Sequence, residues 1–455
     1  MTSSSVRASA AADEKPGRPS RRVAVWYALF AVYAGGVAVF SGPGNDRSWG
    51  IWAAFGYAAA ATLASVWPSR RGRQAALAAS LAGGLAAPLT WLATQAPATP
   101  DVVVVTRSAA LLLHHATPYL PSAQLAHGGW LAYNPYLPFM AIFGLPRALG
   151  LPGLAGDPRP WLAAATFLLL AAAFRAAGRD RASSPGHLGR AAFATASPVL
   201  AFPLAVGITD PPVLALTCLA LALLARPGWI AHRTLLAALA LAAACAMKYT
   251  AWPALVVLTA MIAARDGRRA AARFAATAVT AAAILAAALA PAAGAAPAAL
   301  AQNTLAFPLG LTRARTPAQS PLPGHLLATL GPAGHLAAII LLITAGLAIA
   351  ASLITHPPAD APAAARRLAL GLTLMFALSP ATRFGYFAYP AGLYGWLALS
   401  GQGSPRLGRL LDRGQRYRDP AVRILRAASD LGLRLRSVPL MEPGDASREE
   451  LPRLG

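Results

Sequence analysis

Asp101 is the first residue in this chain whose type and setting could support catalysis. It opens a segment that runs PDVVVVTRSAALLLHHATPY from Pro100 and follows a long apolar run. A carboxylate next to a substrate hydroxyl can accept its proton during nucleophilic attack. Asp101 could instead cap the helix that begins near Pro100. We take it as the candidate base, because ionisable residues at the ends of long apolar runs often mark functional sites.

Asp210 and Lys248 are the next two candidates. Asp210 lies in the sequence GITDPP, where the two prolines suit the first turn of a helix. It is therefore as well suited to cap that helix as to serve as a second catalytic carboxylate. Lys248, in AMKYTAWP, is the one lysine after residue 15. Its position predicts an anionic partner, and the alternative is a side chain that snorkels from a helix end.

Three arginines and two histidines are further candidates, mainly for binding phosphate. Arg313, Arg315 and Arg383 complete a candidate phosphate site, because the guanidinium fork matches phosphate oxygens. His114 and His115 could bind phosphate, a sugar hydroxyl or a metal. Adjacent histidines point to different sides of a helix, which disfavours a metal site made by this pair. Packing at a membrane interface is the alternative for at least one of them.

Aromatic residues cluster just after these histidines. They could form an aromatic belt at a membrane surface or stack on a sugar, and they are Tyr119, Trp130, Tyr133 and Tyr136. The sequence contains no P-loop, dinucleotide fingerprint, HExxH or GxSxG motif. We therefore predict no bound cofactor and no metal ligands, and a divalent-metal requirement is left open.

The elements that must position these residues are membrane-spanning helices. The chain is 56% hydrophobic and 12% charged, against about 25% charged residues in soluble domains. Its apolar residues fall in runs of roughly 15–22, the length that a helix needs to cross a bilayer. The sequence predicts an all-α polytopic membrane protein with about 12 spans, at 23–40, 49–67, 75–95, 160–175, 190–207, 211–225, 234–247, 250–264, 271–292, 334–355, 368–381 and 384–400.

Charge predicts how these spans are oriented. The net charge of +23 suits the cytoplasmic bias of Lys and Arg better than nucleic-acid binding. With both termini cytoplasmic, only eight of the 39 basic residues fall in outer connections. This balance also requires residues 133–150 to be juxtamembrane or re-entrant helices rather than a further span. The expected domains are a disordered tail (1–22), a membrane domain (23–400, with an outer loop at 96–159) and a basic cytoplasmic tail (401–455).

Four segments, taken in order, resemble motifs of the GT-C superfamily, the membrane glycosyltransferases that use polyprenyl-phosphate sugars. The most similar group is the actinobacterial polyprenyl-phosphate-mannose α-mannosyltransferases, and the likeness covers roughly residues 75–400. Asn134 and Tyr136 depart from the family's Tyr-Pro-Pro segment, and Asp101 follows the third span rather than the first. The four segments are the Asp101 helix that ends in HHATPY, YNPYLP from Tyr133, GITD from Gly207 and KYTAWP from Lys248.

The resemblance implies transfer of a hexose, mannose by this likeness, from a polyprenyl-phosphate sugar to an extracytoplasmic glycan, lipid or protein. It implies that Asp101 is the base and that Asp210 positions a substrate. Lys248 and the three arginines would then steady the lipid phosphate. It also implies a place in the plasma membrane and a role in the cell envelope, with no nucleotide sugar and no nucleic-acid partner.

A transporter or flippase for a lipid-linked or anionic solute is the alternative function. Transporters favour internal repeats and charged or broken helices near the midplane of the membrane. No clear repeat occurs here, and the outward charges cluster at the ends of spans. These two features favour the enzyme.

Overall fold

The computed structural model describes residues 18–42, 44–125, 127–178, 186–225, 231–295, 297–314 and 316–401. These residues form helices and a single isolated β-bridge, between Gln319 and Thr382. The predicted all-α polytopic membrane fold is confirmed. Most of the two expected tails lies outside the described residues, so the predicted domain limits stay a prediction.

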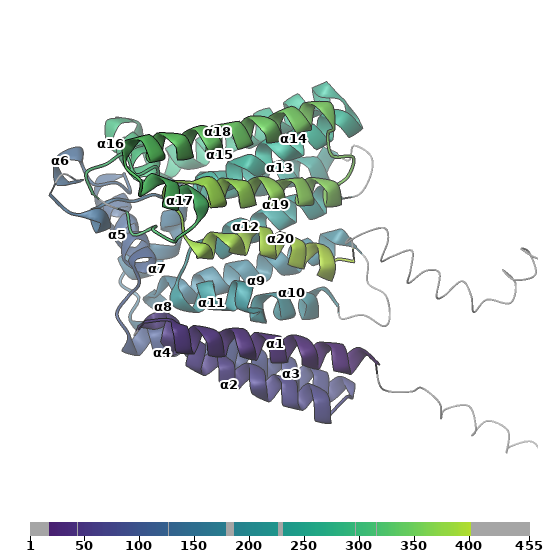
Figure 1. The fold of residues 1–455 in the computed structure, drawn as a ribbon. Helices are drawn as coiled ribbons and strands as arrows, with labels where there is room; N and C mark the ends of the chain where they lie inside the picture. The colour runs from purple at the N-terminus through teal and green to yellow at the C-terminus, as the bar shows by residue number, and fades with distance from the viewer. Residues whose placement is uncertain are drawn as a thin grey trace, which may run out of the picture. The chain divides into compact units, whose positions relative to one another are not determined.

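The chain begins with three long helical segments that lie side by side (Figure 1). The third is a continuous run from Arg70 to Gln95 with a π-helical stretch inside it. Gly56 and Gly83 bring the backbones of the second and third segments into contact, where a Cβ atom on either would clash. These elements are α1 (Arg18–Phe40), α2 (Asn45–Val66), α3 (Arg70–Leu81), η1 (Ala82–Ala86) and α4 (Ala87–Gln95).

Short helices then gather at one end of the long helices, here called the loop end (Figure 1). The expected juxtamembrane segment 133–150 is not a span, because prolines divide it into short pieces. The elements between the third and fourth spans are α5 (Pro100–His115), α6 (Ser122–Leu125), η2 (Trp130–Ala132), η3 (Pro138–Gly144), α7 (Leu145–Ala148) and α8 (Gly153–Gly156).

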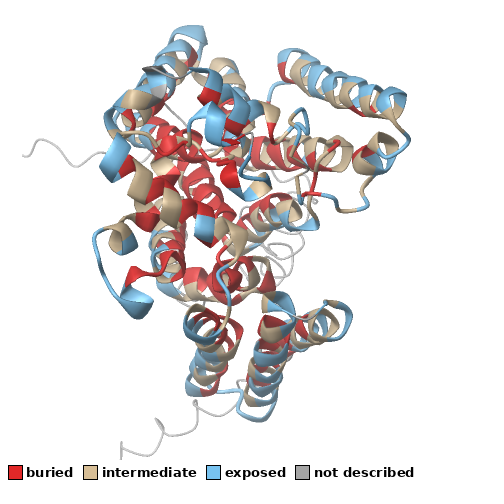
Figure 2. Cartoon of the chain, turned by 90° about the vertical axis from the view of Figure 1, so that its left-hand side faces the viewer, coloured by how far each residue is buried: buried red, intermediate tan, exposed pale blue. Residues whose placement is uncertain are grey.

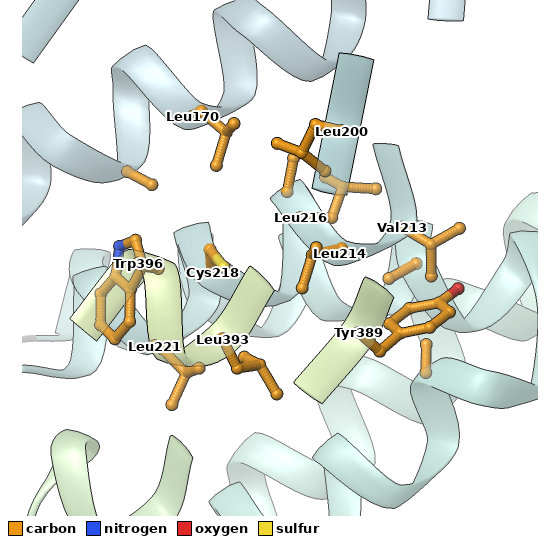
Figure 3. Close-up of a cluster of buried hydrophobic side chains, with 14 of the residues drawn as sticks. Leu170, Leu200, Val213, Leu214, Leu216, Cys218, Leu221, Tyr389, Leu393 and Trp396 are labelled. Carbon is orange, nitrogen blue, oxygen red and sulfur yellow. The ribbon is translucent and has the colours of Figure 1, made fainter. Parts of the chain in front are cut away.

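The central helices follow. α12 is apolar on all sides and almost entirely buried, as expected of a helix surrounded by others. Its side chains pack against α9, α11 and α20 in the cluster that Figure 3 shows around Leu214 and Leu393. The elements are α9 (Pro158–Ala177), α10 (His187–Ala196), α11 (Pro198–Val206), α12 (Asp210–Leu224) and α13 (Ala231–Met247).

The remaining elements complete the bundle and return to the loop end between α15 and α18. Figure 2, which views the loop end, shows burial concentrated in the centre and exposed faces on the outer helices. These exposed faces carry large apolar side chains, as lipid contact requires. The elements are η4 (Tyr249–Ala251), α14 (Trp252–Asp266), α15 (Arg268–Leu289), η5 (Pro291–Ala295), α16 (Pro297–Ala301), η6 (Gln302–Ala306), α17 (Pro323–Ala328), α18 (Pro332–Thr355), α19 (Ala361–Leu378), η7 (Phe384–Phe387) and α20 (Ala388–Leu399).

Each of the twelve expected spans holds a helix. Seven of the described helices are long and apolar enough to cross a membrane, and eight if the bent pair α10–α11 counts as one span. The total of twelve therefore stays a prediction. Successive long helices run in opposite directions, so the ends at which α2, α9, α12, α14 and α18 finish lie opposite the loop end. Arginines of the described helices stand at this opposite end, among them Arg70, Arg175, Arg233, Arg265 and Arg268.

Candidate functional site

A cavity of about 350 Å³ opens among the loop-end segments, within the size range of ligand sites. Its wall combines the start of α5, the connection before η3, the start of α12, the connection after α13 and the turn before α20. The cavity therefore joins parts of the chain that are far apart in sequence. The charged residues in its wall are Asp101, Asp210, Lys248 and Arg383.

Asp101 lies in the first turn of α5, where the helix dipole favours a negative charge. The N-cap position belongs to Thr99, whose hydroxyl donates to the Val206 carbonyl at 2.8 Å. Asp101 is therefore not the cap of this helix. Its Oδ1 instead accepts a hydrogen bond from the hydroxyl of Tyr136.

Asp210 and Lys248 form a buried ion pair in the wall of the cavity. Lys248 Nζ lies 2.5 Å from Asp210 Oδ1, and the Tyr389 hydroxyl donates to the same oxygen at 2.8 Å. The Thr250 hydroxyl lies 2.8 Å from that of Tyr389 and extends the network. Burial lowers the pKa of Lys248, but Asp210 together with Tyr386 and Asp101 outweighs this effect and raises the pKa, so the lysine keeps its charge.

Asp210 owes its place to the turn that precedes α12. Gly207 ends α11 with φ of 91°, in the left-handed region that favours glycine. A Cβ atom here would collide with Val102 and with the side chain of Arg159. Thr209 occupies the N-cap position of α12, and the Asp210 carboxylate bonds Lys248 and Tyr389 rather than the first amides of the helix.

The connection that carries Tyr136 is fixed by buried amide side chains. Asn134 Nδ2 donates to Ser108 Oγ at 2.9 Å, and its backbone N–H donates to Asn303 Oδ1 at 2.7 Å. The neighbouring Tyr133 stacks on Phe307, with ring centroids 4.6 Å apart. The connection before η3 and the loop after η6 are therefore packed together, and both line the cavity.

Arg383 enters the cavity from the turn between α19 and α20. This turn is pinned to the 316–320 segment, because Thr382 N–H donates to the Ala318 carbonyl and Ser320 N–H to the Thr382 carbonyl, each at 2.9 Å. The Arg383 side chain is half-buried, and it is the cavity's second cation beside Lys248.

One side of the cavity is apolar. Leu342 of α18 and Met375 and Phe376 of α19 line it, and Leu305 and Leu309 add to it from the loop after η6. α18 is the least buried of the membrane-length helices. The apolar side therefore adjoins the outer, lipid-exposed part of the bundle.

Several of the predicted site residues do not line this cavity. His114 and His115 are exposed at the far end of α5, which at about 1.5 Å per residue carries them roughly 20 Å from Asp101. Arg313 is exposed and outside the wall, and Arg315 lies outside the described residues. Tyr119 is buried behind the wall and donates to the Tyr136 carbonyl at 2.9 Å.

Other site residues were not predicted as such from the sequence. The Tyr136 ring could be recognised as aromatic, but nothing local indicated that its hydroxyl meets Asp101. Tyr386, Tyr389 and Thr250 stand in or beside apolar runs, where a tyrosine is typical of an interfacial belt. Among the described residues, no group of three or more His, Cys, Asp or Glu side chains could hold a metal ion.

The site combines a carboxylate able to accept a proton, two cations able to hold an anion, and an apolar side. On a bundle of membrane-length helices, this set has the features that a membrane enzyme acting on a lipid-linked, anionic substrate requires. Residues 134–380 match the model of glycosyltransferase family 87, and because this is more than half of the chain, the protein belongs to that family. Neither the curated proteins nor the solved structures include a match.

Family membership confirms the predicted glycosyltransferase class and gives no support to the transporter alternative. The matched range contains Asp210 and Lys248. Asp101 lies 33 residues before this range and Arg383 three residues after it, so the cavity is completed by residues outside the matched region.

Proposed function

We propose that this chain transfers a hexose from a polyprenyl-phosphate sugar to an extracytoplasmic acceptor hydroxyl, and that this hexose is mannose. The observation that carries the proposal is the division of one cavity into a charged side with Asp101, Lys248 and Arg383 and an apolar side formed by α18 and α19. A sugar phosphate attached to a lipid needs both environments. The acceptor is a glycan, a lipid or a protein.

The reaction is a single displacement with inversion at the sugar. The acceptor oxygen forms a bond to the anomeric carbon as the bond from that carbon to the phosphate oxygen breaks. Asp101 takes the acceptor proton, and the electron pair of the broken bond leaves with the polyprenyl phosphate. The position of Asp101 in the first turn of α5, beside the cavity, supports this role.

The leaving phosphate is stabilised by the two cations of the cavity. Arg383 offers a forked set of donors, and Lys248 offers a point charge. Asp210 holds Lys248 at 2.5 Å, which supports a role for Asp210 in orienting the lysine. Tyr133, which lines the cavity from the connection before η3, contributes to sugar binding. Arg313 remains a phosphate contact only if its loop moves inward when the donor binds.

The lipid chain lies along the apolar side of the cavity, against Leu342, Met375 and Phe376. We place the loop end outside the plasma membrane and both termini in the cytoplasm. The arginines of the described helices at the opposite end, such as Arg70, Arg175 and Arg268, support this orientation, because Lys and Arg favour the cytoplasmic side. The enzyme would then act in the cell envelope.

The proposal is tested by supplying membranes that contain this chain with radiolabelled sugar donors. Polyprenyl-phosphate-mannose, polyprenyl-phosphate-glucose and a nucleotide-linked mannose are compared at equal concentration. We expect transfer from the lipid-linked mannose and none from the nucleotide sugar. Transfer only from the nucleotide sugar would overturn the donor class, and transfer only from the lipid-linked glucose would overturn mannose alone.

A further inference from the structure

We propose that Tyr136 is a positioning residue for the transfer reaction, whose hydroxyl holds the Asp101 carboxylate in place within the cavity. The inference rests on the proposed function, in which Asp101 is the base. It gives a role in the reaction to an uncharged residue of the YNPYLP segment, which the sequence marked only as one of a cluster of aromatic residues.

The contact geometry points to this role. The Tyr136 hydroxyl donates to Asp101 Oδ1, and no hydrogen bond from the described residues reaches the second carboxylate oxygen. One oxygen of Asp101 is therefore occupied by the protein, which leaves the other for the acceptor proton. A carboxylate fixed through one oxygen presents the other in a defined direction, as general-base catalysis requires.

Tyr136 is itself held in place, mainly through its backbone. Its backbone N–H donates to Asn134 Oδ1 at 3.0 Å, and its carbonyl accepts from the Tyr119 hydroxyl at 2.9 Å. The next residue, Leu137, donates its N–H to the Met247 carbonyl at 2.9 Å, directly before Lys248. Lys248 Nζ lies 5.1 Å from the centroid of the Tyr136 ring, within cation–π range.

The hydroxyl keeps its proton in this environment. Tyr136 is only 4% exposed, and burial, reinforced by the charge of Asp101, raises its pKa well above the ordinary value. Tyr136 therefore acts as a hydrogen-bond donor to a charged acceptor, which is the stronger kind of hydrogen bond. The same contacts assign Tyr119 and Asn134, which do not reach the reacting groups, to the support of Tyr136.

The test compares Tyr136→Phe with Tyr57→Phe in the lipid-linked sugar assay. Tyr57 is the matched control, because its buried hydroxyl also makes a short hydrogen bond, at 2.7 Å to the Ala196 carbonyl, away from the cavity. We expect Tyr136→Phe to lower kcat by about 10-fold to 100-fold with KM for the donor unchanged, since one charge-assisted hydrogen bond is lost. Tyr57→Phe should leave both constants within about twofold of wild type.

A rise in KM alone, or a kcat within about twofold of wild type, would overturn the proposal. A second readout does not depend on the donor. Infrared difference spectra of the purified protein contain a carboxylate band that Asp101→Asn removes, and Tyr136→Phe should shift that band while Tyr57→Phe leaves it in place. An unmoved band in Tyr136→Phe would refute the hydrogen bond. If wild type transfers no lipid-linked sugar, the proposed function fails and the role of Tyr136 in transfer fails with it, whereas the infrared result still decides whether Tyr136 is hydrogen-bonded to Asp101.

Discussion

Two regions of this protein bury polar side chains, and they use them differently. Within the N-terminal helices, Trp49 Nε1 donates to the Gly84 carbonyl at 2.8 Å, and the Tyr57 hydroxyl reaches from them to the Ala196 carbonyl of α10 at 2.7 Å. Both carbonyls lie where a helix is irregular, in the π-helical stretch η1 and at the 65° bend between α10 and α11. The donors there satisfy backbone groups that the irregular helices leave without partners.

In the cavity, the buried polar groups satisfy one another instead. Lys248, Asp210, Tyr389 and Thr250 form one network of side chains, and Tyr136 and Asp101 form another. Unlike a bond to a helix carbonyl, these contacts build no secondary structure. The comparison suggests that polar burial which completes a helix supports the fold, whereas polar burial between side chains around a cavity supports a reaction. The predictions below separate these two uses.

The largest effect is expected from breaking the buried ion pair. Lys248→Met leaves Asp210 charged and without a counter-ion at a site where its side chain is only 4% exposed. We expect a loss of about 3–5 kcal/mol in the free energy of unfolding and loss of sugar transfer. Thermal unfolding in detergent and the transfer assay measure the two effects.

The double variant Asp210→Asn/Lys248→Met is the control for this prediction. Removing both charges should recover most of the stability without recovering transfer. A stable double variant that transfers sugar at the wild-type rate would show that the pair belongs to the fold and not to the reaction.

A backbone change at the cavity is expected to affect stability and activity together. Gly207→Ala places a Cβ atom on a residue with a left-handed backbone conformation, where it would clash with Val102 and Arg159. We expect a loss of about 1–3 kcal/mol in stability, together with reduced transfer, because the same turn places Asp210. Circular dichroism melts and transfer rates would be measured in parallel, and a variant that lost neither would exclude this turn as a determinant of the site.

Tyr57→Phe tests the other side of the comparison. It leaves the Ala196 carbonyl buried without its donor and should reduce stability by about 1–2 kcal/mol. The transfer rate per folded molecule should not change, because the cavity lies elsewhere. If kcat dropped with the same variant, the N-terminal helices would have to be counted as part of the functional unit.

The smallest effect is expected at the far end of α5. Ala116 ends this helix with φ of 55° and is the one non-glycine residue with positive φ among the described residues. Glycine is favoured there, so Ala116→Gly should raise stability by about 0.5–1 kcal/mol. Transfer should be unaffected because Asp101 lies at the opposite end of the helix, and a changed rate would indicate that the whole of α5 moves during the reaction.

The positions of the long helices could be predicted closely from the sequence, because the length of an apolar run sets the span. The range 49–67 is close to α2, and 271–292 is close to α15. The break within 190–207 was not predicted. Pro198 was visible, but whether a proline bends a helix by 65° or starts a new one depends on what packs around it.

The members of the site could be predicted in part. Asp101, Asp210, Lys248 and Arg383 stand out by charge in an apolar chain, and the expected topology placed them on one side. Their pairing could not be predicted, since Lys248 and Asp210 are 38 residues apart and Tyr389 lies 179 residues from Asp210. His114 and His115 were predicted as site residues because they lie close to Asp101 in the sequence, but the continuous helix α5 places them far from the cavity.

The most direct test of the account is the transfer of lipid-linked mannose by Asp101→Asn, measured beside Asp360→Asn at matched expression. Asp360 provides the same substitution outside the cavity, where its side chain caps α19 by accepting from Ala363 N–H at 2.7 Å, a role that asparagine also performs. We predict that Asp101→Asn lowers transfer by at least about 100-fold while both variants fold normally and Asp360→Asn retains activity. Equal transfer by Asp101→Asn and wild type would contradict the central claim and remove Asp101 from the reaction.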